Sequence, residues 1–157
     1  MDSCQKRHAE AELLFKQCLD KRKTVLGEDH VLTNSTMLNL TSTYNDQGKN
    51  DEAEILQKQC LDKQIRLLGE DHPNTLAVMY NLANTLLKDK GKYDEAEKLY
   101  KKTHNKQIKV LGETHTCTLD TTHNLANSYK IQGKTGELNK FILLNSNAFM
   151  KICERQK

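Results

Sequence analysis

The sequence lacks tryptophan and has one proline, and no run of apolar residues approaches the roughly 20 that a membrane span needs. Residues 1 to 15 carry charges where a signal peptide would be apolar. We therefore predict a cytoplasmic protein without a membrane segment. A length of 157 residues suffices for one ordinary domain.

A strong excess of one charge is also missing, because the net charge is only +3 and the two signs are interspersed. No nucleic-acid partner is therefore predicted. The five cysteines are odd in number, widely spaced and without a CxxC pair, which indicates reduced thiols. Since the sequence has no phosphate loop, nucleophile motif or metal-ligand cluster, we predict neither an enzyme nor a cofactor.

The sequence does contain a five-residue motif that occurs three times, here called the repeated phrase. LGEDH occupies 26–30 and 68–72, and LGETH follows at 111–115, at intervals of 42 and 43 residues. Glycine tolerates positive φ and marks helix ends. Glycines recur at steps of 21 or 22, as Gly27, Gly48, Gly69, Gly91, Gly112 and Gly133. The intervening segments have helical length.

Two helix types alternate between these glycines. In NTLAVMYNLANTLL the apolar residues, Leu76, Met79, Leu82, Ala83 and Leu86, form one stripe of a helix, here named helix A. The segment YDEAEKLYKKTHNKQIKVL (helix B) gathers Ala96, Leu99, Tyr100 and Thr103 on one face. This alternation predicts an all-α, right-handed solenoid of antiparallel helical hairpins. We predict a single array that begins with a helix B at 2–26 and continues with repeats at 30–68, 72–111 and 115–153. The last helix is expected to be degenerate or capping.

The repeated phrase is interpreted as the joint between hairpins. Leu68 ends a helix on the core, Gly69 takes the left-handed position, and Asp71 or His72 caps the next helix before Pro73. Other reactive residues receive structural interpretations. The histidines at 30, 72 and 115 are expected to cap helices rather than bind metal, Cys18 and Cys60 to pack at helix crossings, and Asp51, Glu52, Asp94 and Glu95 to complement helix dipoles.

The stretch NLANTLLKDKGKYDEAEKLY (81–100) resembles the tetratricopeptide repeat, with Leu82, Ala83, Leu86, Gly91, Tyr93 and Ala96 at that family's packing positions. The 42-residue period, with LGEDHPNTL, NLAN and QGK, is similar to the kinesin light chain type of repeat over about residues 9 to 145. The chain opens inside a helix B and lacks a long heptad segment. A fragment or truncated relative is expected, and association with a motor is not implied.

The resemblance implies a protein–protein interaction module, a scaffold or adaptor whose A helices line a groove for an acidic or mixed peptide. Carried over by the motif, the groove residues are Ser42, Asn45, Tyr80, Asn84, Leu87, Lys88, His123, Asn127 and Lys130. The first Asn of each motif (Asn39, Asn81, Asn124) is expected to brace neighbouring helices. Two alternatives stay open. In the first, the polar face is merely solvated and binds nothing tightly. In the second, the array stacks or self-associates through exposed residues at its ends, which are Leu13, Leu14 and Phe15 at one end and Phe141, Ile142, Leu143 and Leu144 at the other.

Overall fold

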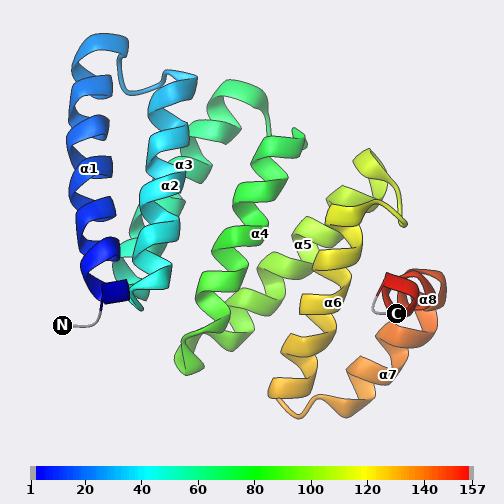
Figure 1. Ribbon diagram of the computed structural model, residues 1–157. Coiled ribbons are helices and arrows are strands. Elements are labelled where there is room, and N and C mark those ends of the chain that lie inside the picture. Colours follow the sequence, from blue (N-terminus) through cyan, green and yellow to red (C-terminus); the bar gives the residue numbers. More distant parts are fainter. Residues whose placement is uncertain (1–2, 156–157) are drawn as a thin grey trace. The chain divides into compact units, whose positions relative to one another are not determined.

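The computed structural model describes residues 3–155, which are helical throughout apart from short joints and contain no strand (Figure 1). The helices are α1 (Ser3–Leu26), α2 (Val31–Asp46), α3 (Asn50–Leu68), α4 (Pro73–Leu87), α5 (Tyr93–Leu111), α6 (Thr116–Ile131), α7 (Thr135–Leu144) and α8 (Ser146–Arg155), with a 3-10 turn η1 (Lys90–Lys92). The predicted all-α fold is confirmed. Within these residues, none of the helices has the length and apolar character required to cross a membrane.

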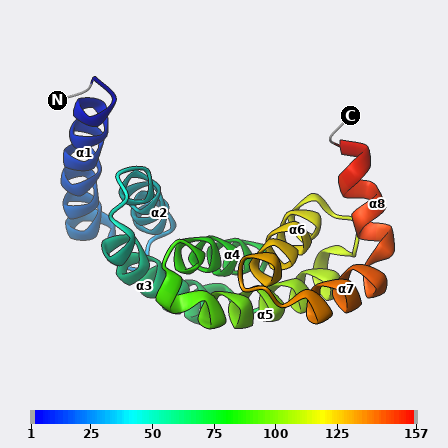
Figure 2. The ribbon, with the colours of Figure 1, turned by 90° about the horizontal axis from the view of Figure 1, so that it is seen from below.

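The helices form two compact units, residues 1–67 and 68–157. In the first unit α1 packs against α2, and α3 returns from the turn at Gly48. In the second unit α5 packs against both α4 and α6, and α6 packs against α7 and α8. Figure 2 shows α4 and α6 side by side on one layer, with α5 and α7 on the other. The core of this unit contains Leu76, Met79, Leu86, Tyr100 and Leu125, all nearly inaccessible to solvent.

Each of the first two joints between hairpins is built around a glycine, a threonine and a histidine. In the second joint Gly69 has a φ of +88°, and the hydroxyl of Thr75 donates to the Gly69 carbonyl at 2.8 Å. Nδ1 of His72 accepts a hydrogen bond of 3.1 Å from the backbone N–H of Asn74, which caps α4. The first joint has the same arrangement, made by Gly27, Thr33 and His30. The predicted role of histidine as a helix cap is confirmed, and it holds for His115 as well.

The acidic residues of the repeated phrase hold the far end of the same hairpin. Lys106 of α5 lies 2.5 Å from Asp71 and 3.0 Å from Glu70, and Lys102 lies 2.5 Å from Glu70. The first joint has equivalent pairs, Lys63 with Glu28 and Arg66 with Asp29. Each of these solvent-exposed pairs contributes little to stability by itself, because water screens the charges. Their recurrence explains why the phrase keeps Glu and Asp beside Gly and His.

The third joint lacks part of this arrangement. Gly112 has φ 93° and ψ 159°, a conformation open essentially to glycine alone, and His115 caps α6. Thr114 stands where the other joints have Asp, and the buried hydroxyl of Thr118 has no partner among the described residues. The threonine bond and the ion pairs of the first two joints are therefore not reproduced in this part of the described chain.

The segment after the third hairpin turn is two helices. α7 and α8 have 10 residues each and meet at Asn145. The backbone N–H of Asn145 and its Nδ2 both donate to the carbonyl of Phe141, at 3.1 and 2.9 Å. These two hydrogen bonds to one carbonyl end α7. The region expected to be a degenerate or capping helix therefore bends sharply at Asn145.

Gly91 departs from its expected role as a helix-ending glycine with positive φ. It lies within η1, and its φ is not positive. The turn from helix A to helix B is one residue longer here than at Gly48 and Gly133, as the 22-residue step in the glycine series shows. The side chain of Asp89 accepts a 2.9 Å bond from the Gly91 N–H, and the 3-10 turn absorbs the extra residue.

A buried glutamate of helix B anchors the hairpin that follows. In the second unit Glu97 lies 2.6 Å from Nζ of Lys101 and 2.7 Å from Nζ of Lys134, and Nε2 of Gln132 donates to it at 3.1 Å. Burial opposes ionisation of Glu97, but the lysines and the amide outweigh burial and hold its pKa below the usual value. The QGK sequence after helix A therefore binds the last Glu of the DEAE sequence one hairpin earlier.

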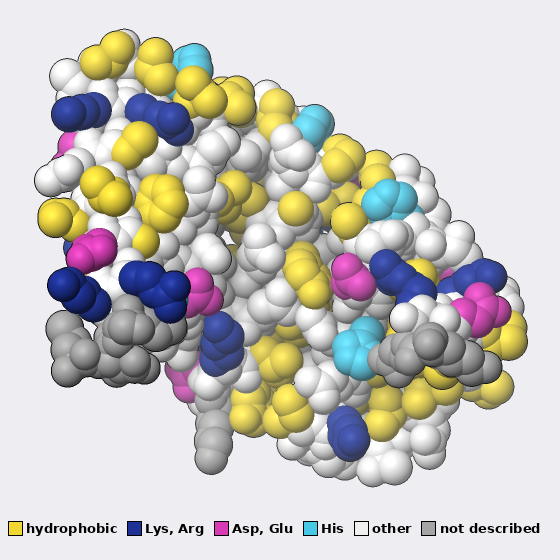
Figure 3. Space-filling view, viewed as in Figure 1, with side chains coloured by type: hydrophobic (Ala, Val, Ile, Leu, Met, Phe, Trp, Pro, Cys, Tyr) yellow, Lys and Arg dark blue, Asp and Glu magenta, His cyan; other side chains and the backbone are white. Residues whose placement is uncertain are grey.

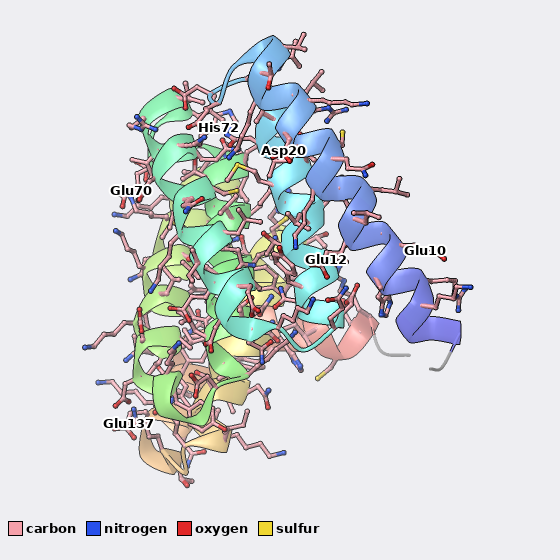
Figure 4. The ribbon with its side chains drawn as sticks, turned by 90° about the vertical axis from the view of Figure 1, so that its left-hand side faces the viewer. Glu10, Glu12, Asp20, Glu70, His72 and Glu137 are labelled. Carbon is pink, nitrogen blue, oxygen red and sulfur yellow. The ribbon has the colours of Figure 1, made fainter. Side chains whose placement is uncertain are left out.

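The first unit repeats this glutamate contact with Glu12. Its carboxylate lies 2.6 Å from Nζ of Lys16 and 2.6 Å from Nζ of Lys49, and these lysines, Lys16 foremost, lower its pKa to about 2. In Figure 4, Glu12 points from α1 toward the neighbouring helices, whereas Glu10 points outward. The dipole role predicted for the DEAE sequences does not include this contact between hairpins.

We predict that Glu97→Gln lowers the free energy of unfolding by about 1 to 3 kcal/mol, the usual contribution of hydrogen bonds to a charged group. The reason is that Lys101 and Lys134 lose their buried anionic acceptor. Urea unfolding followed by circular dichroism measures the change. The matched control is Glu10→Gln at an exposed position of α1, which should leave the midpoint unaltered. Equal midpoints for both variants would show that the Glu97 contact contributes nothing.

Candidate functional site

Helices α4 and α6 each turn one stripe of side chains toward solvent, at steps of three and four residues. On α4 it runs through Ala77, Tyr80, Asn84 and Leu87, and on α6 through Asp120, His123, Asn127 and Lys130. The predicted groove residues Tyr80, Asn84, Leu87, His123, Asn127 and Lys130 lie on these stripes, with Lys88 at the C-cap of α4. Ser42 and Asn45 lie on α2 in the other unit.

A pocket of about 300 Å³ opens between α4, α6 and α8 within the second unit. Its lining consists of Tyr80, Leu119, Asp120, His123, Asn124, Ile152 and Arg155. Tyr80 and His123 are the two predicted groove residues that the structure brings together here. Asn127 and Lys130 lie further along α6, and Leu87 and Lys88 lie at the far end of α4.

Tyr80 and Asn124 form the floor of the pocket and belong to a hydrogen-bonded network that also contains Asn84 and Tyr100. Nδ2 of Asn124 donates to Oη of Tyr80 at 2.8 Å and to Oδ1 of Asn84 at 2.9 Å. The hydroxyl of the fully buried Tyr100 donates to the same Oδ1 of Asn84, and the rings of Tyr80 and Tyr100 meet edge to face at 6.2 Å. The network joins α4, α5 and α6, so the predicted bracing role is confirmed for Asn124.

Burial and charge set the electrostatics of the pocket. Burial raises the pKa of Tyr80, a hydrogen bond with the Asn84 side chain opposes this rise, and the nearby Asp120 carboxylate raises the pKa further. Burial likewise raises the pKa of Tyr100, so both phenols stay protonated. At the rim, Nη1 of Arg155 lies 3.5 Å from Oδ1 of Asp120. The acidic and the basic side chain of the rim therefore neutralise each other.

An aromatic cluster centred on Phe141 positions α8 beside the pocket. The Phe141 ring meets those of His104, Tyr129 and Phe149 at centroid distances of 5.4, 5.7 and 6.0 Å. Nε2 of His104 lies 3.0 Å from the Thr122 hydroxyl, whose own hydrogen goes to a backbone carbonyl. Nε2 therefore carries the proton and donates. Helix α8, which supplies Ile152 and Arg155 to the pocket, packs on this cluster through Phe149.

Sequence reasoning missed four residues of the pocket lining, Leu119, Asp120, Ile152 and Arg155. Asp120 lies one turn before His123 on the same stripe, so helical periodicity could have found it. No sequence signal places Ile152 and Arg155 there, because their position depends on the bend at Asn145. Among the side chains that the structure describes, no group of three or more His, Cys, Asp or Glu is placed to hold a metal ion.

Comparison with known proteins assigns the family. A tetratricopeptide repeat model matches residues 2–64, 33–105 and 86–137, which together span most of the chain. The chain belongs to the tetratricopeptide repeat family. Its repeats are of the kinesin light chain type. Among proteins of curated function, none matches its sequence.

Solved structures with the same tetratricopeptide architecture support this assignment. Two crystal structures of a kinesin light chain candidate from Podosopora anserina, with nearly identical TPR-like repeats, are 25% identical to this chain. Their TM-scores are 0.78 and 0.77, and the alignments cover 96% and 94% of this chain and 70% of that protein. BtubC (BKLC) from P. vanneervenii has a TM-score of 0.77 at 20% identity, covers 90% of this chain and 56% of its own, and shows the fold alone. The chain is thus a repeat scaffold for protein interaction.

We predict that His104→Leu reduces the loss of stability on mild acidification, because burial lowers the pKa of His104 in the folded state. The neutral imidazole contributes stability above the unfolded pKa of about 6.5, and this contribution is lost as the pH falls through the lower folded value. Leu is the residue that helices α1 and α3 carry at the same repeat position, Leu19 and Leu61.

The measurement is thermal unfolding at a series of pH values from neutral down to the range where carboxylates begin to titrate. The matched control is His123→Leu, since His123 is exposed on α6. A wild-type pH dependence retained in full by His104→Leu would contradict the prediction.

Proposed function

We propose that the exposed stripes of α4 and α6 bind an extended segment of a partner protein. The observation that carries this proposal is the pocket between α4, α6 and α8, where side chains with hydrogen-bonding groups surround a volume of about 300 Å³. A floor held by three hydrogen bonds in one network is ordered before a ligand arrives. Such preorganisation reduces the entropy that binding costs.

The stripe beyond the pocket has the chemistry that an extended peptide requires. The amide of the exposed Asn127 offers a donor and an acceptor to a peptide backbone without regard to its sequence. The exposed ammonium groups of Lys88 and Lys130 attract acidic side chains, which agrees with an acidic or mixed partner. Because these charges face solvent, we expect the affinity to be modest and to fall with added salt.

The test is selection from a randomised peptide library on immobilised protein, followed by affinity measurement for the enriched peptides. We predict that Asn127→Ala combined with Lys130→Ala weakens binding at least tenfold, because a backbone contact and a charge contact are lost together. Lys140→Ala, at an exposed position of α7, is the control and should bind as wild type does. Helicity is compared for all three proteins. Failure of the folded wild type to enrich any peptide would refute peptide capture.

A second function is favoured by the apolar side chains exposed at both ends of the array. On α1, Leu13 and Leu14 are 57% and 64% exposed, and Figure 3 shows hydrophobic side chains along this helix. On α7, Leu143 and Leu144 are 77% and 71% exposed. Phe141, also expected at that end, is instead engaged in the aromatic cluster. Contiguous exposed apolar residues are typical of association surfaces, and we propose end-to-end stacking of copies or repeats as the alternative.

For this alternative we predict association that depends on concentration and is suppressed by Leu14→Glu or Leu143→Glu. A charge placed in an apolar contact must be desolvated, which opposes assembly. Sedimentation velocity over a range of concentrations gives the distribution of species. Leu67→Glu, at another exposed leucine on α3, is the control for added charge. A wild-type protein that stays monomeric at every concentration would exclude self-association.

A further inference from the structure

The floor of the pocket leaves one acceptor and one donor uncommitted. Both hydrogens of the Asn124 amide are used, one toward Tyr80 and one toward Asn84. Its Oδ1 is left as an acceptor, and no hydrogen bond to that atom is found among the described side chains. The phenolic oxygen of Tyr80 accepts from Asn124, and its contact with the Asn84 side chain lowers the pKa of the phenol, as a donor to that oxygen does, so the phenolic hydrogen is available as a donor. Both residues line the pocket.

The donor and the acceptor both lie close to Nδ2 of Asn124. Oδ1 and Nδ2 belong to one planar amide, and that Nδ2 lies 2.8 Å from the Tyr80 oxygen. The network fixes the orientation of the Asn124 amide, since its Nδ2 is held by two oxygens at once. A ligand group that satisfies both atoms must therefore present an acceptor and an N–H side by side.

We propose that this pocket binds the side-chain carboxamide of a glutamine in the partner segment. A primary carboxamide carries its oxygen and one N–H on the same edge, so it can accept from Tyr80 and donate to Asn124 together. A trans peptide unit directs its C=O and N–H in opposite directions and cannot make both bonds at this edge. The inference rests on the proposed function in that the glutamine belongs to the captured segment.

Charged side chains fit the pocket less well. A carboxylate has acceptors only, so one of its oxygens would face Oδ1 of Asn124 without a proton between them. An ammonium group lacks the acceptor that the Tyr80 hydroxyl requires. The rim supplies no net charge to compensate, because Asp120 and Arg155 pair with each other. Leu119 and Ile152 add apolar walls along which the two methylenes of glutamine can lie.

The first experiment uses small probes, so it does not depend on any peptide. Propionamide and propionate, which reproduce the ends of glutamine and glutamate, are titrated into the isotopically labelled protein. We expect propionamide to shift the side-chain amide resonances of Asn124 in a saturable manner and propionate to leave them unchanged. Equal shifts with both probes, or no shift with propionamide, would overturn the proposed specificity.

The second experiment uses the peptides selected by the library. We expect Gln at one position of the enriched peptides, and a Gln→Glu change there should weaken binding about tenfold, the usual discrimination of a two-bond contact. In Tyr80→Phe this Gln/Glu ratio should fall toward one. In Asn127→Ala both peptides should weaken equally and keep the ratio, because Asn127 lies outside the pocket.

The outcomes separate the two proposals. Peptides that bind without a Gln preference, or with a preference unchanged in folded Tyr80→Phe, would overturn the carboxamide site and leave peptide capture standing. Binding of propionamide at Asn124, together with failure to enrich any peptide, would support the pocket chemistry and refute peptide capture.

Discussion

The joint between hairpins is the constraint on which the remaining structure depends. A glycine with positive φ ends one helix, a threonine hydroxyl bonds back to its carbonyl, and a histidine Nδ1 caps the next helix. Because these contacts are local, each joint sends the chain into the next hairpin at the same place in the repeat. That placement decides which face of helix A meets helix B. The solvent-facing stripe of Tyr80 and Asn84 is what remains once the opposite face, with Leu76 and Met79, is buried.

The sequence predicted these local features because they leave periodic marks. Helical spacing identified the buried and exposed faces of α4 and α6, and the repeated LGEDH identified the caps. Contacts across many residues left weaker marks. Glu97 and Lys134 are far apart in the sequence and meet only because the helices and turns between them fold back. The DEAE sequence by itself is equally consistent with a role at the helix dipole. Glu12 and Lys49 recur two repeats later as Glu97 and Lys134, so comparing the repeats with one another, rather than reading each segment alone, would have found the contact.

The two asparagines of the NLAN sequence have roles that differ from those the motif implied. The motif assigned the second Asn to the groove and the first to bracing. Between α4 and α6, Oδ1 of Asn84 is the shared acceptor of the network, whereas Asn124 uses its hydrogens for bracing and still carries a free oxygen at the pocket. An amide can do both because donor and acceptor are separate atoms. Which end is free depends on the partner helix, and a single repeat sequence does not contain that information.

The limited attachment of α8 bears on how the pocket would accommodate a ligand. Its floor is fastened by Tyr100 and the two asparagines within the best-packed part of the second unit. Its far wall belongs to α8, a helix of 10 residues that packs on α6 and α7 through the buried Ala148, the ring of Phe149 and a half-exposed ion pair at Arg155. Isolated helices of this length are marginal in water. Local opening at α8 therefore costs little, and a ligand bound as we propose would meet an ordered floor and an adaptable wall.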